Sequence, residues 1–210
     1  MELPGQVRVV DDVPRAFARL VAQTAPRSIA LSGGELAHLC YSALRSEPID
    51  WSAIDVYIGD ERVVPVESDE SNEGMARRIL LDAVKPRAVH SMVDAGADAY
   101  DAIVRAAAPI DLVHLGLGPD GHTASLFPGS PALDEQERFV VATSDDLHPF
   151  PRLTFTFPAI ASSRLAVMTV AGAEKRDAIR RIRAGEDLPA TRLPPDQLLW
   201  IGDRAALAAD

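Results

Sequence analysis

The sequence is poor in cysteine, lysine and aromatic residues. Cys40 is the one cysteine among 210 residues, so no disulfide can form within the chain, and a reducing cytoplasm is the expected location. Its apolar neighbours Leu36, Leu39, Ala43 and Leu44 recur at helical spacing. We therefore expect Cys40 to be a packed core thiol and not a nucleophile.

Positive charge is also scarce. Lys85 and Lys175 are the only lysines, and 21 Lys and Arg residues face 31 Asp and Glu residues, which gives a net charge of −10. Such a protein is a poor partner for nucleic acid or an anionic membrane. An anionic small substrate would need a local cluster of cations.

Several sequence signals are missing altogether. No apolar run approaches the roughly 18 residues of a membrane span, and residues 1–5 contain neither the basic nor the apolar region of a signal peptide. The sequence has no H-x-x-x-H and no C-x-x-C. We therefore expect no membrane partner, no cleaved leader and no metal site.

What the chain does have is a regular alternation of short apolar runs and helical patterns. The expected strands are 7–10, 28–31, 54–58, 89–93, 111–117, 139–143, 152–157, 164–171 and 197–201. The expected helices follow Asp11 and Asp12 and then cover about 35–46, 71–81, 98–107, 173–184 and a short terminal segment. This order predicts an α/β fold with a largely parallel sheet covered on both faces, in a single domain spanning 1–210.

Three polar, glycine-bearing loops come directly after predicted strands. They are Ser32-Gly33-Gly34, Gly59-Asp60-Glu61-Arg62 and the segment 116–122. Taken alone, the first could be a tight turn and the second a surface ion pair. Because the carboxyl ends of parallel strands meet at one edge of a sheet, the three loops are expected to converge on one crevice, where ligands bind. Backbone N–H groups of the 32–34 turn, next to a helix start, favour an anion.

The loop after strand 111–117 contains the most informative pattern in the chain. It places three glycines, Asp120 and His122 in one turn. A histidine there can change its charge near neutral pH, so His122 is the candidate general base. His114 alternates with apolar residues inside the strand and is expected to be a hydrogen-bonded core residue. Ser125 lacks a G-x-S-x-G elbow and is a weak candidate nucleophile.

Two nucleotide-binding motifs overlap this loop. Residues 116–121 read G-x-G-x-x-G, and Asp145 or Asp146 could then bind a ribose. A dinucleotide site needs a full helix from the third glycine, however, and the proline and glycine residues of 128–131 stop one. The segment also fits a phosphate-binding loop except that His122 replaces the essential lysine.

An ordered set of motifs resembles the 6-phosphogluconolactonase family over nearly the whole chain. The set comprises Leu31-Ser32-Gly33-Gly34, the segment 59–65 with Ser71-Asn72, the segment 115–128, Pro151-Arg152-Leu153-Thr154, Gly172-Ala173-Glu174-Lys175, Leu188-Pro189-Ala190 and Trp200. The resemblance implies a Rossmann-like three-layer αβα sandwich, shared with glucosamine-6-phosphate deaminase and ribose-5-phosphate isomerase. It implies hydrolysis of 6-phospho-D-glucono-1,5-lactone to 6-phosphogluconate, in the oxidative pentose phosphate pathway and without a cofactor.

The resemblance also suggests roles for individual residues. His122 would take a proton from the attacking water, and either Asp120 or Asp60 would orient it or the sugar hydroxyls. Backbone N–H groups of the glycine turns, or Arg62, would hold the developing oxyanion. The expected substrate-binding residues are Ser32, Gly33, Gly34, Asn72, Gly121, Arg152 and Lys175, with the phosphate on Arg152, Lys175 and the 32–34 turn.

Two rival functions remain at this stage. The deaminase is similar at Gly-x-Asp-Gly-His, but its loop continues with Asn-Glu-Pro, whose Glu supports ring opening. The aligned tripeptide in this chain is Leu126-Phe127-Pro128. It lacks the carboxylate and therefore favours lactone hydrolysis. A non-catalytic sugar-phosphate sensor would usually carry a DNA-binding domain, for which this acidic chain has no room.

The chain departs from the family pattern at one site position. Glu35 stands where the family has Ser or Thr after the paired glycines. A carboxylate in a first helical turn suits the helix dipole. It also removes a hydroxyl and adds a negative charge near the expected phosphate.

Overall fold

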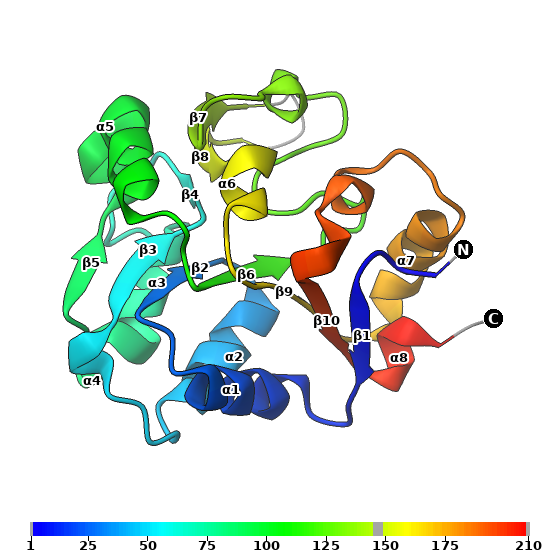
Figure 1. Ribbon diagram of the computed structural model, residues 1–210, viewed down its shortest axis with the longest axis horizontal. Coiled ribbons are helices and arrows are strands. Elements are labelled where there is room, and N and C mark those ends of the chain that lie inside the picture. The colour runs from blue at the N-terminus through cyan, green and yellow to red at the C-terminus, as the bar shows by residue number, and fades with distance from the viewer. Residues whose placement is uncertain (1, 145–148, 209–210) are drawn as a thin grey trace.

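Seven parallel strands form the central sheet of the computed structural model, which describes residues 2–144 and 149–208 (Figure 1). The strands are β1 (Gln6–Val9), β2 (Ser28–Leu31), β3 (Asp55–Ile58), β5 (Ala88–His90), β6 (Leu112–Gly116), β9 (Ala166–Val170) and β10 (Leu198–Gly202). Their order across the sheet is β1-β10-β9-β6-β2-β3-β5. β6 and β2 thus lie in the middle, and their carboxyl ends open on the same edge.

Helices cover both faces of this sheet. Figure 1 shows α1 (Val13–Thr24) and α2 (Glu35–Leu44) on one side, with α5 (Met92–Ala107) and α6 (Phe157–Ala161) on the other. The remaining helices are α3 (Asn72–Ala76), which continues through a π-helical turn (Arg77–Leu81) into α4 (Asp82–Val84), and α7 (Arg176–Arg183) and α8 (Arg204–Leu207). The three-layer α/β fold expected from the sequence is confirmed.

The local signals explain several helix starts. Asp12 accepts a hydrogen bond from the backbone N–H of Arg15 at 2.9 Å and begins α1, and Pro14 occupies the first turn. Ser71 accepts from the N–H of Gly74 in the same way and begins α3. These caps satisfy N–H groups that a helix cannot satisfy internally.

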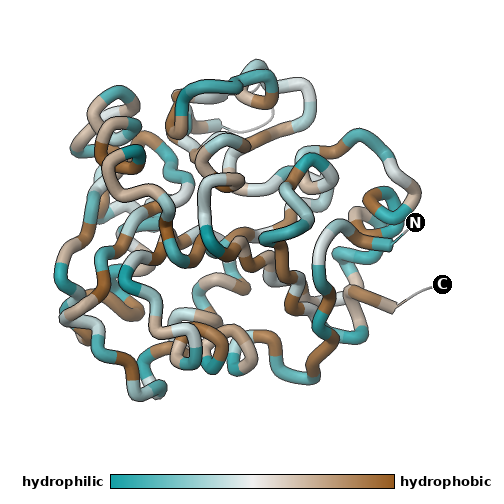
Figure 2. The backbone as a smooth tube through the Cα atoms, in the orientation of Figure 1, coloured by the Kyte–Doolittle hydropathy of each residue, from teal (hydrophilic) through white to brown (hydrophobic). Residues whose placement is uncertain are grey.

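The hydrophobic core follows the central sheet. In Figure 2 the apolar residues concentrate along the central strands, while the helices alternate between polar and apolar residues. One cluster of buried side chains extends from Leu3 to Leu207, and β6 and β10 contribute fully buried runs. The interpretation of the chain as a single domain stays a prediction.

A second, antiparallel sheet corrects one sequence expectation. The runs 139–143 and 152–157 were expected to extend the largely parallel sheet, but they form β7 (Val140–Thr143) and β8 (Arg152–Phe155) of a separate sheet. In it β8 lies between β7 and β4 (Asp60–Arg62) and pairs with both. β4 begins two residues after β3 ends, so the chain passes from one sheet to the other at Gly59. Apolar periodicity identifies a strand but not the sheet it joins.

The segment 89–93 is the second difference. The strand β5 ends at His90, and Ser91 caps α5 by accepting from the N–H of Asp94. Met92 and Val93 therefore belong to a helix, although their apolar character suggested a strand. A serine cap followed by an acidic first turn is the signal that overrides β propensity here.

Candidate active site

A cavity of about 510 Å³ opens at the carboxyl ends of β2, β3, β6 and β9. The three glycine-bearing loops meet there. The expected site residues that line it are Ser32, Gly33, Gly34, Asp60, Arg62, Asn72, His122, Arg152 and Lys175. The structure thus brings together residues that the sequence separates by more than 140 positions.

His122 is held by a neighbouring carboxylate. Its Nδ1 lies 2.6 Å from Oδ1 of Asp120, which also accepts the backbone N–H of His122 at 3.1 Å. Partial burial raises the pKa of Asp120, but the hydrogen bond from His122 and its charge outweigh this and lower that pKa to about 2. An ionised Asp120 fixes the proton on Nδ1, so Nε2 is the ring nitrogen suited to accept a proton.

Gly118 provides the space in which the His122 ring lies. A Cβ atom at residue 118 would lie 2.1 Å from Nδ1 of His122, far inside van der Waals contact. The N–H of Gly118 also donates to the carbonyl of His122 at 2.8 Å, which closes the turn. Glycine is therefore required here for close approach of a side chain and not for an unusual φ angle.

Phe127 packs against both His122 and a cation. Its ring centroid lies 4.9 Å from that of His122, and the Arg152 guanidinium lies 5.4 Å from the same ring. Phe127 is only 2% exposed. The position at which the deaminase resemblance would require a carboxylate is therefore an apolar wall beside His122.

Two arginines face each other across the small sheet. Arg62 of β4 and Arg152 of β8 are register partners, so their side chains start about 5 Å apart on one face. Both line the cavity, and Arg152 is buried. Arg62 donates to the carbonyl of Glu70 at 2.7 Å, which fixes its direction. This positive pair is a local exception in a protein of net charge −10.

Lys175 reaches the cavity from the opposite side. It follows β9, and its Nζ donates to the carbonyl of Leu117 at 2.7 Å. Asp203 supports the same loop by accepting the N–H of Gly172 at 3.0 Å while it caps α8. Cations from β4, β8 and the β9–α7 loop thus surround one space.

Asp60 is committed to a serine and not to His122. Its Oδ2 accepts from the hydroxyl of Ser125 at 2.7 Å, and its backbone carbonyl accepts from the side-chain amide of Asn72 at 2.8 Å. That amide lies so close to Gly33 that a Cβ atom there would come within 1.9 Å of it. Asp120 is consequently the carboxylate that orients His122, and Ser125 is fully buried.

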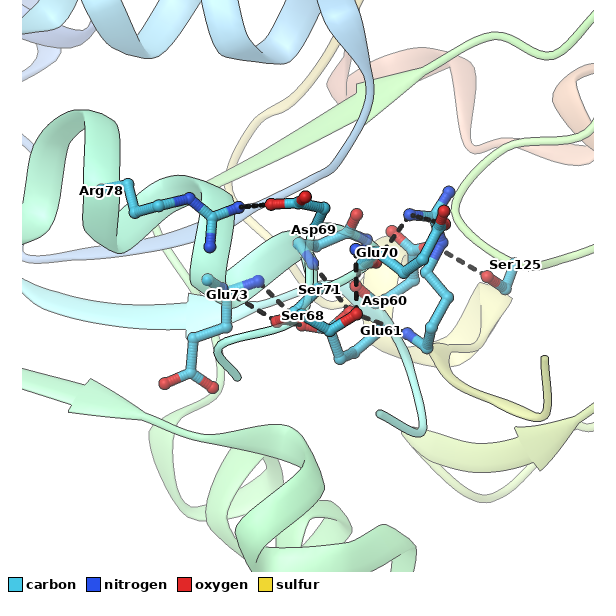
Figure 3. A network of polar contacts seen from close by, with 12 residues as sticks. Asp60, Glu61, Ser68, Asp69, Glu70, Ser71, Glu73, Arg78 and Ser125 are labelled. Carbon is cyan, nitrogen blue, oxygen red and sulfur yellow. Dashed lines mark hydrogen bonds and ion pairs between the residues drawn. The ribbon is translucent and has the colours of Figure 1, made fainter. Parts of the chain in front are cut away.

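Glu61 is a site residue that the sequence interpretation passed over. Figure 3 shows its carboxylate beside Ser71 and Glu73, at the start of α3. It accepts the Ser71 hydroxyl at 3.0 Å and the backbone N–H groups of Arg62, Asn72 and Glu73 at 2.7–2.8 Å. Burial raises the pKa of Glu61, and these hydrogen bonds oppose the rise.

The segment 59–62 is therefore not a surface ion pair. Glu61 is 1% exposed, and its carboxylate organises the backbone that carries Arg62 and Asn72 to the cavity. Only the pairing of acidic and basic residues was visible in the sequence. The serine-led helix start at Ser71 was the available hint that a buried acceptor lies nearby.

Two expected site residues do not line the cavity. Gly121 has a φ of 85°, its N–H donates to the carbonyl of Gly118, and its own carbonyl accepts from Ala190. Its polar backbone groups hold the turn and are not presented to a ligand. Asp120 also lies outside the lining and acts on the cavity through His122.

Two further sequence expectations, for Cys40 and His114, are confirmed, and a third concerns residues that the structure does not describe. Cys40 is buried, and burial raises its pKa to about 12 against a hydrogen bond with Thr169, so a core thiol is confirmed. His114 is a hydrogen-bonded core residue as expected. Asp145 and Asp146, the possible ribose ligands of the dinucleotide alternative, lie outside the described residues.

Comparison with known proteins identifies the family. The model of a family described as glucosamine-6-phosphate isomerases/6-phosphogluconolactonase matches residues 6–200. This chain belongs to that family. Curated relatives named 6-phosphogluconolactonase include one from Synechocystis sp., 38% identical over 92% of this chain and 89% of its own length. Another, from Mycobacterium tuberculosis, is 39% identical over the same shares.

Solved structures agree with this placement. A 6-phosphogluconolactonase from Leishmania guyanensis superimposes with a TM-score of 0.83 at 25% identity over 98% of each chain. The enzyme of that name from Trypanosoma brucei gives 0.78 at 28% identity over 98% of each. A monomeric glucosamine-6-phosphate deaminase gives 0.80 at 20% identity, which shows the shared fold alone.

The structure also bears on membrane spans and metal sites. Across residues 2–144 and 149–208, none of the helices combines the length and apolarity that a membrane crossing requires. Within the same ranges, no three His, Cys, Asp or Glu side chains are grouped so that they could hold a metal ion.

Proposed function

We propose that this chain hydrolyses 6-phospho-D-glucono-1,5-lactone to 6-phosphogluconate. The observation that carries the proposal is the Asp120–His122 pair at a cavity with cations on two sides, in a chain that belongs to the lactonase and deaminase family. Phe127 beside His122 favours the lactonase branch, because ring opening of an amino sugar would need a carboxylate there.

The reaction uses His122 first as a base and then as an acid. Nε2 takes a proton from a water molecule while the water oxygen bonds to the lactone carbonyl carbon. The resulting oxyanion collapses, the bond from that carbon to the ring oxygen breaks, and the imidazolium returns its proton to the ring oxygen. Asp120 stabilises the transient positive charge on His122.

Arg62 is the group that we assign to the oxyanion. The sequence left this role open between Arg62 and the glycine turns. The N–H groups of Gly118 and Gly121 donate to His122 and Gly118 carbonyls within the turn, so they are not available to a substrate. Arg62 lines the cavity, and a fixed cation stabilises the negative charge that develops on the carbonyl oxygen.

The phosphate is assigned to Lys175, Arg152 and the turn at Ser32–Gly34. All of them line the cavity, and α2 begins after this turn with Gly34 at the N-cap and no side chain capping it. Its first N–H groups and the helix dipole therefore favour an anion. Absence of nucleic-acid partners and a cytoplasmic location stay predictions.

A timed assay tests the activity. The lactone is generated fresh by oxidation of glucose 6-phosphate, and its disappearance is compared with spontaneous hydrolysis in the same buffer. Hydrolysis no faster than the spontaneous rate would refute the proposal. Release of ammonia from glucosamine 6-phosphate would instead assign the chain to the deaminase branch.

Loss of Lys175 should weaken recognition of the phosphate selectively. We expect Lys175→Met and Arg152→Met each to reduce the affinity for 6-phosphogluconate by about 1.5–3 kcal/mol, the usual value of a hydrogen bond to a charged group. Calorimetry with gluconate should show little change. Arg176→Met is the matched control, because Arg176 is exposed, donates to the carbonyl of Ala205 and lies outside the cavity lining. Equal losses for both ligands would remove these cations from phosphate recognition.

Glu35 should have little influence on the phosphate, despite its charge. Its side chain is exposed at the cavity mouth, where water screens a carboxylate. We expect Glu35→Ser to change the affinity for 6-phosphogluconate by less than about threefold and to cost at most about 1 kcal/mol of stability through the helix dipole. A tenfold or greater gain in affinity, measured at fixed salt, would mean that Glu35 opposes the phosphate directly.

A further inference from the structure

A buried hydrogen-bond network lies directly beneath the turn at Ser32. Tyr41, on α2, is fully buried, and its hydroxyl accepts the backbone N–H of Ser32 at 2.7 Å and donates to the carbonyl of Ser32 at 3.1 Å. The same hydroxyl lies 2.8 Å from Nδ1 of His114. Nε2 of His114 lies 2.9 Å from the hydroxyl of Thr169.

Counting protons assigns a direction to each bond once the Tyr41 proton is placed on the Ser32 carbonyl, which can only accept. The Tyr41 hydroxyl has one proton, which it gives to the carbonyl of Ser32. Nδ1 of His114 must then carry a proton and donate it to Tyr41, which leaves a lone pair on Nε2. Thr169 consequently donates to Nε2. In the opposite tautomer, the Tyr41 hydroxyl would donate to Nδ1 of His114. The buried carbonyl of Ser32 would then lack a donor, which would lower the stability of the fold.

The network does not titrate near neutral pH. Burial lowers the pKa of His114 to about 3, and the Phe17 ring lies 4.2 Å from the imidazole, centroid to centroid. Burial also raises the pKa of Tyr41 well above its usual value. Neither group therefore changes its charge over the neutral pH range.

The network ties three elements to one turn. Tyr41 belongs to the second turn of α2, His114 to β6 and Thr169 to β9. Ser32, His114 and Thr169 line the cavity, whereas Tyr41 lies behind that wall. Because both polar backbone groups of Ser32 bond to Tyr41, the following N–H groups at the start of α2 are held in one orientation relative to β2.

We propose that Tyr41 and His114 are positioning residues that hold the Ser32–Gly34 turn in its phosphate-binding conformation. The proposal rests on the proposed function, because it assigns a purpose to the phosphate end of that site. Tyr41 acts through the backbone of Ser32, and His114 keeps the single Tyr41 proton directed at the Ser32 carbonyl. Neither residue needs to touch the substrate.

A second tyrosine offers an unusually close control. Tyr100 is also fully buried. Its hydroxyl accepts the N–H of Ile58 at 2.8 Å, and its one proton faces the carbonyls of Ile58 and His90, both at 3.2 Å. Ile58 is at the end of β3, the neighbour of β2, but it does not line the cavity. Tyr41→Phe and Tyr100→Phe therefore remove the same group from the same kind of backbone contact.

The test compares ligands with and without phosphate. We expect Tyr41→Phe to weaken binding of 6-phosphogluconate about tenfold and to raise KM for the lactone similarly, the effect of roughly one lost hydrogen bond. The kcat, its pH profile and the affinity for gluconate should stay within about twofold of wild type, because an uncharged network does not contact His122. Tyr100→Phe should lower Tm comparably and leave the ratio of the two affinities unchanged.

The outcomes separate this inference from the function on which it rests. Unchanged 6-phosphogluconate affinity in folded Tyr41→Phe, or equal weakening for gluconate, would overturn the positioning role even if wild type hydrolyses the lactone. A wild-type protein that binds 6-phosphogluconate and fails to hydrolyse the lactone would refute the function. Calorimetry of Tyr41→Phe with 6-phosphogluconate would still show whether Tyr41 supports phosphate binding by the Ser32–Gly34 turn.

A measurement on the wild-type protein covers the case in which Tyr41→Phe fails to fold. Nitrogen-15 spectra of the histidine rings should show His114 protonated at Nδ1 and unprotonated at Nε2 across the neutral pH range. A ring protonated at Nε2 would place the Tyr41 proton on His114 and contradict the proposal.

Discussion

His122→Asn is expected to fold normally and to lower kcat by about 10²–10⁴, the usual contribution of a general base. The reason is the geometry at the cavity, where Asp120 holds Nδ1 at 2.6 Å and directs the rest of the ring to the ligand space. Steady-state kinetics with fresh lactone and a thermal melt measure the two quantities separately. His38→Asn is the matched control, since His38 is exposed on α2 and does not line the cavity.

Substitution of Asp120, the hydrogen-bond partner of His122, should also lower kcat. Asp120→Asn removes the negative charge that keeps the proton on Nδ1 and stabilises the imidazolium, and it should lower kcat strongly, with little change in KM. Because the pair works as one unit, the double variant should be little slower than His122→Asn alone. Near-normal kcat in a folded His122 variant would exclude this histidine from the mechanism, and additive losses would separate the two residues.

Gly118→Ala should have the second large effect, although alanine adds a single methyl group. The new Cβ atom would lie 2.1 Å from Nδ1 of His122, so the ring must move away from Asp120 and from the substrate. Displacement of a catalytic group by about 1 Å costs on the order of 10²-fold in rate. We expect that loss in kcat, with a small change in Tm, because Gly118 is not in the left-handed region and alanine causes no backbone strain there.

Gly116→Ala is the comparison for this variant. A Cβ atom at Gly116 meets nothing within 4 Å, although the residue ends β6, two positions before Gly118, and lines the same cavity. Its kcat should stay within a few-fold of wild type, while KM can rise because the added methyl group occupies space in the cavity. Equal losses of kcat in both variants would show that the loop backbone, and not the His122 ring, is what alanine disturbs.

Local signals gave a large part of the fold in advance. Apolar runs and the acidic pair Asp11 and Asp12 predicted most strands and helices to within a few residues. Glycine-bearing loops after β2, β3 and β6 predicted a shared crevice, because parallel strands end at one edge. The failures were informative: Met92 and Val93 joined a helix because the Ser91 cap outweighed their apolar character.

Contacts between distant residues were beyond the sequence. The sequence left Asp60 open as a partner of His122, and only the fold shows that the Asp60 carboxylate binds Ser125, 65 positions away. Likewise, Glu61 resembled half of a surface ion pair, and only burial against α3 made it the acceptor of three backbone N–H groups.

The sequence by itself determined the alternation of strands and helices, the polar loops at strand ends and the choice of His122 as the candidate base, since these depend on neighbouring residues in the chain. The tertiary structure alone decided that β7 and β8 join β4 in a separate sheet, which sets Arg152 opposite Arg62. It alone decided that Tyr41 meets His114 across 73 positions beneath Ser32. Such pairings are selected by packing and by the need to satisfy buried polar groups, which depend on the whole folded chain and not on any segment of it.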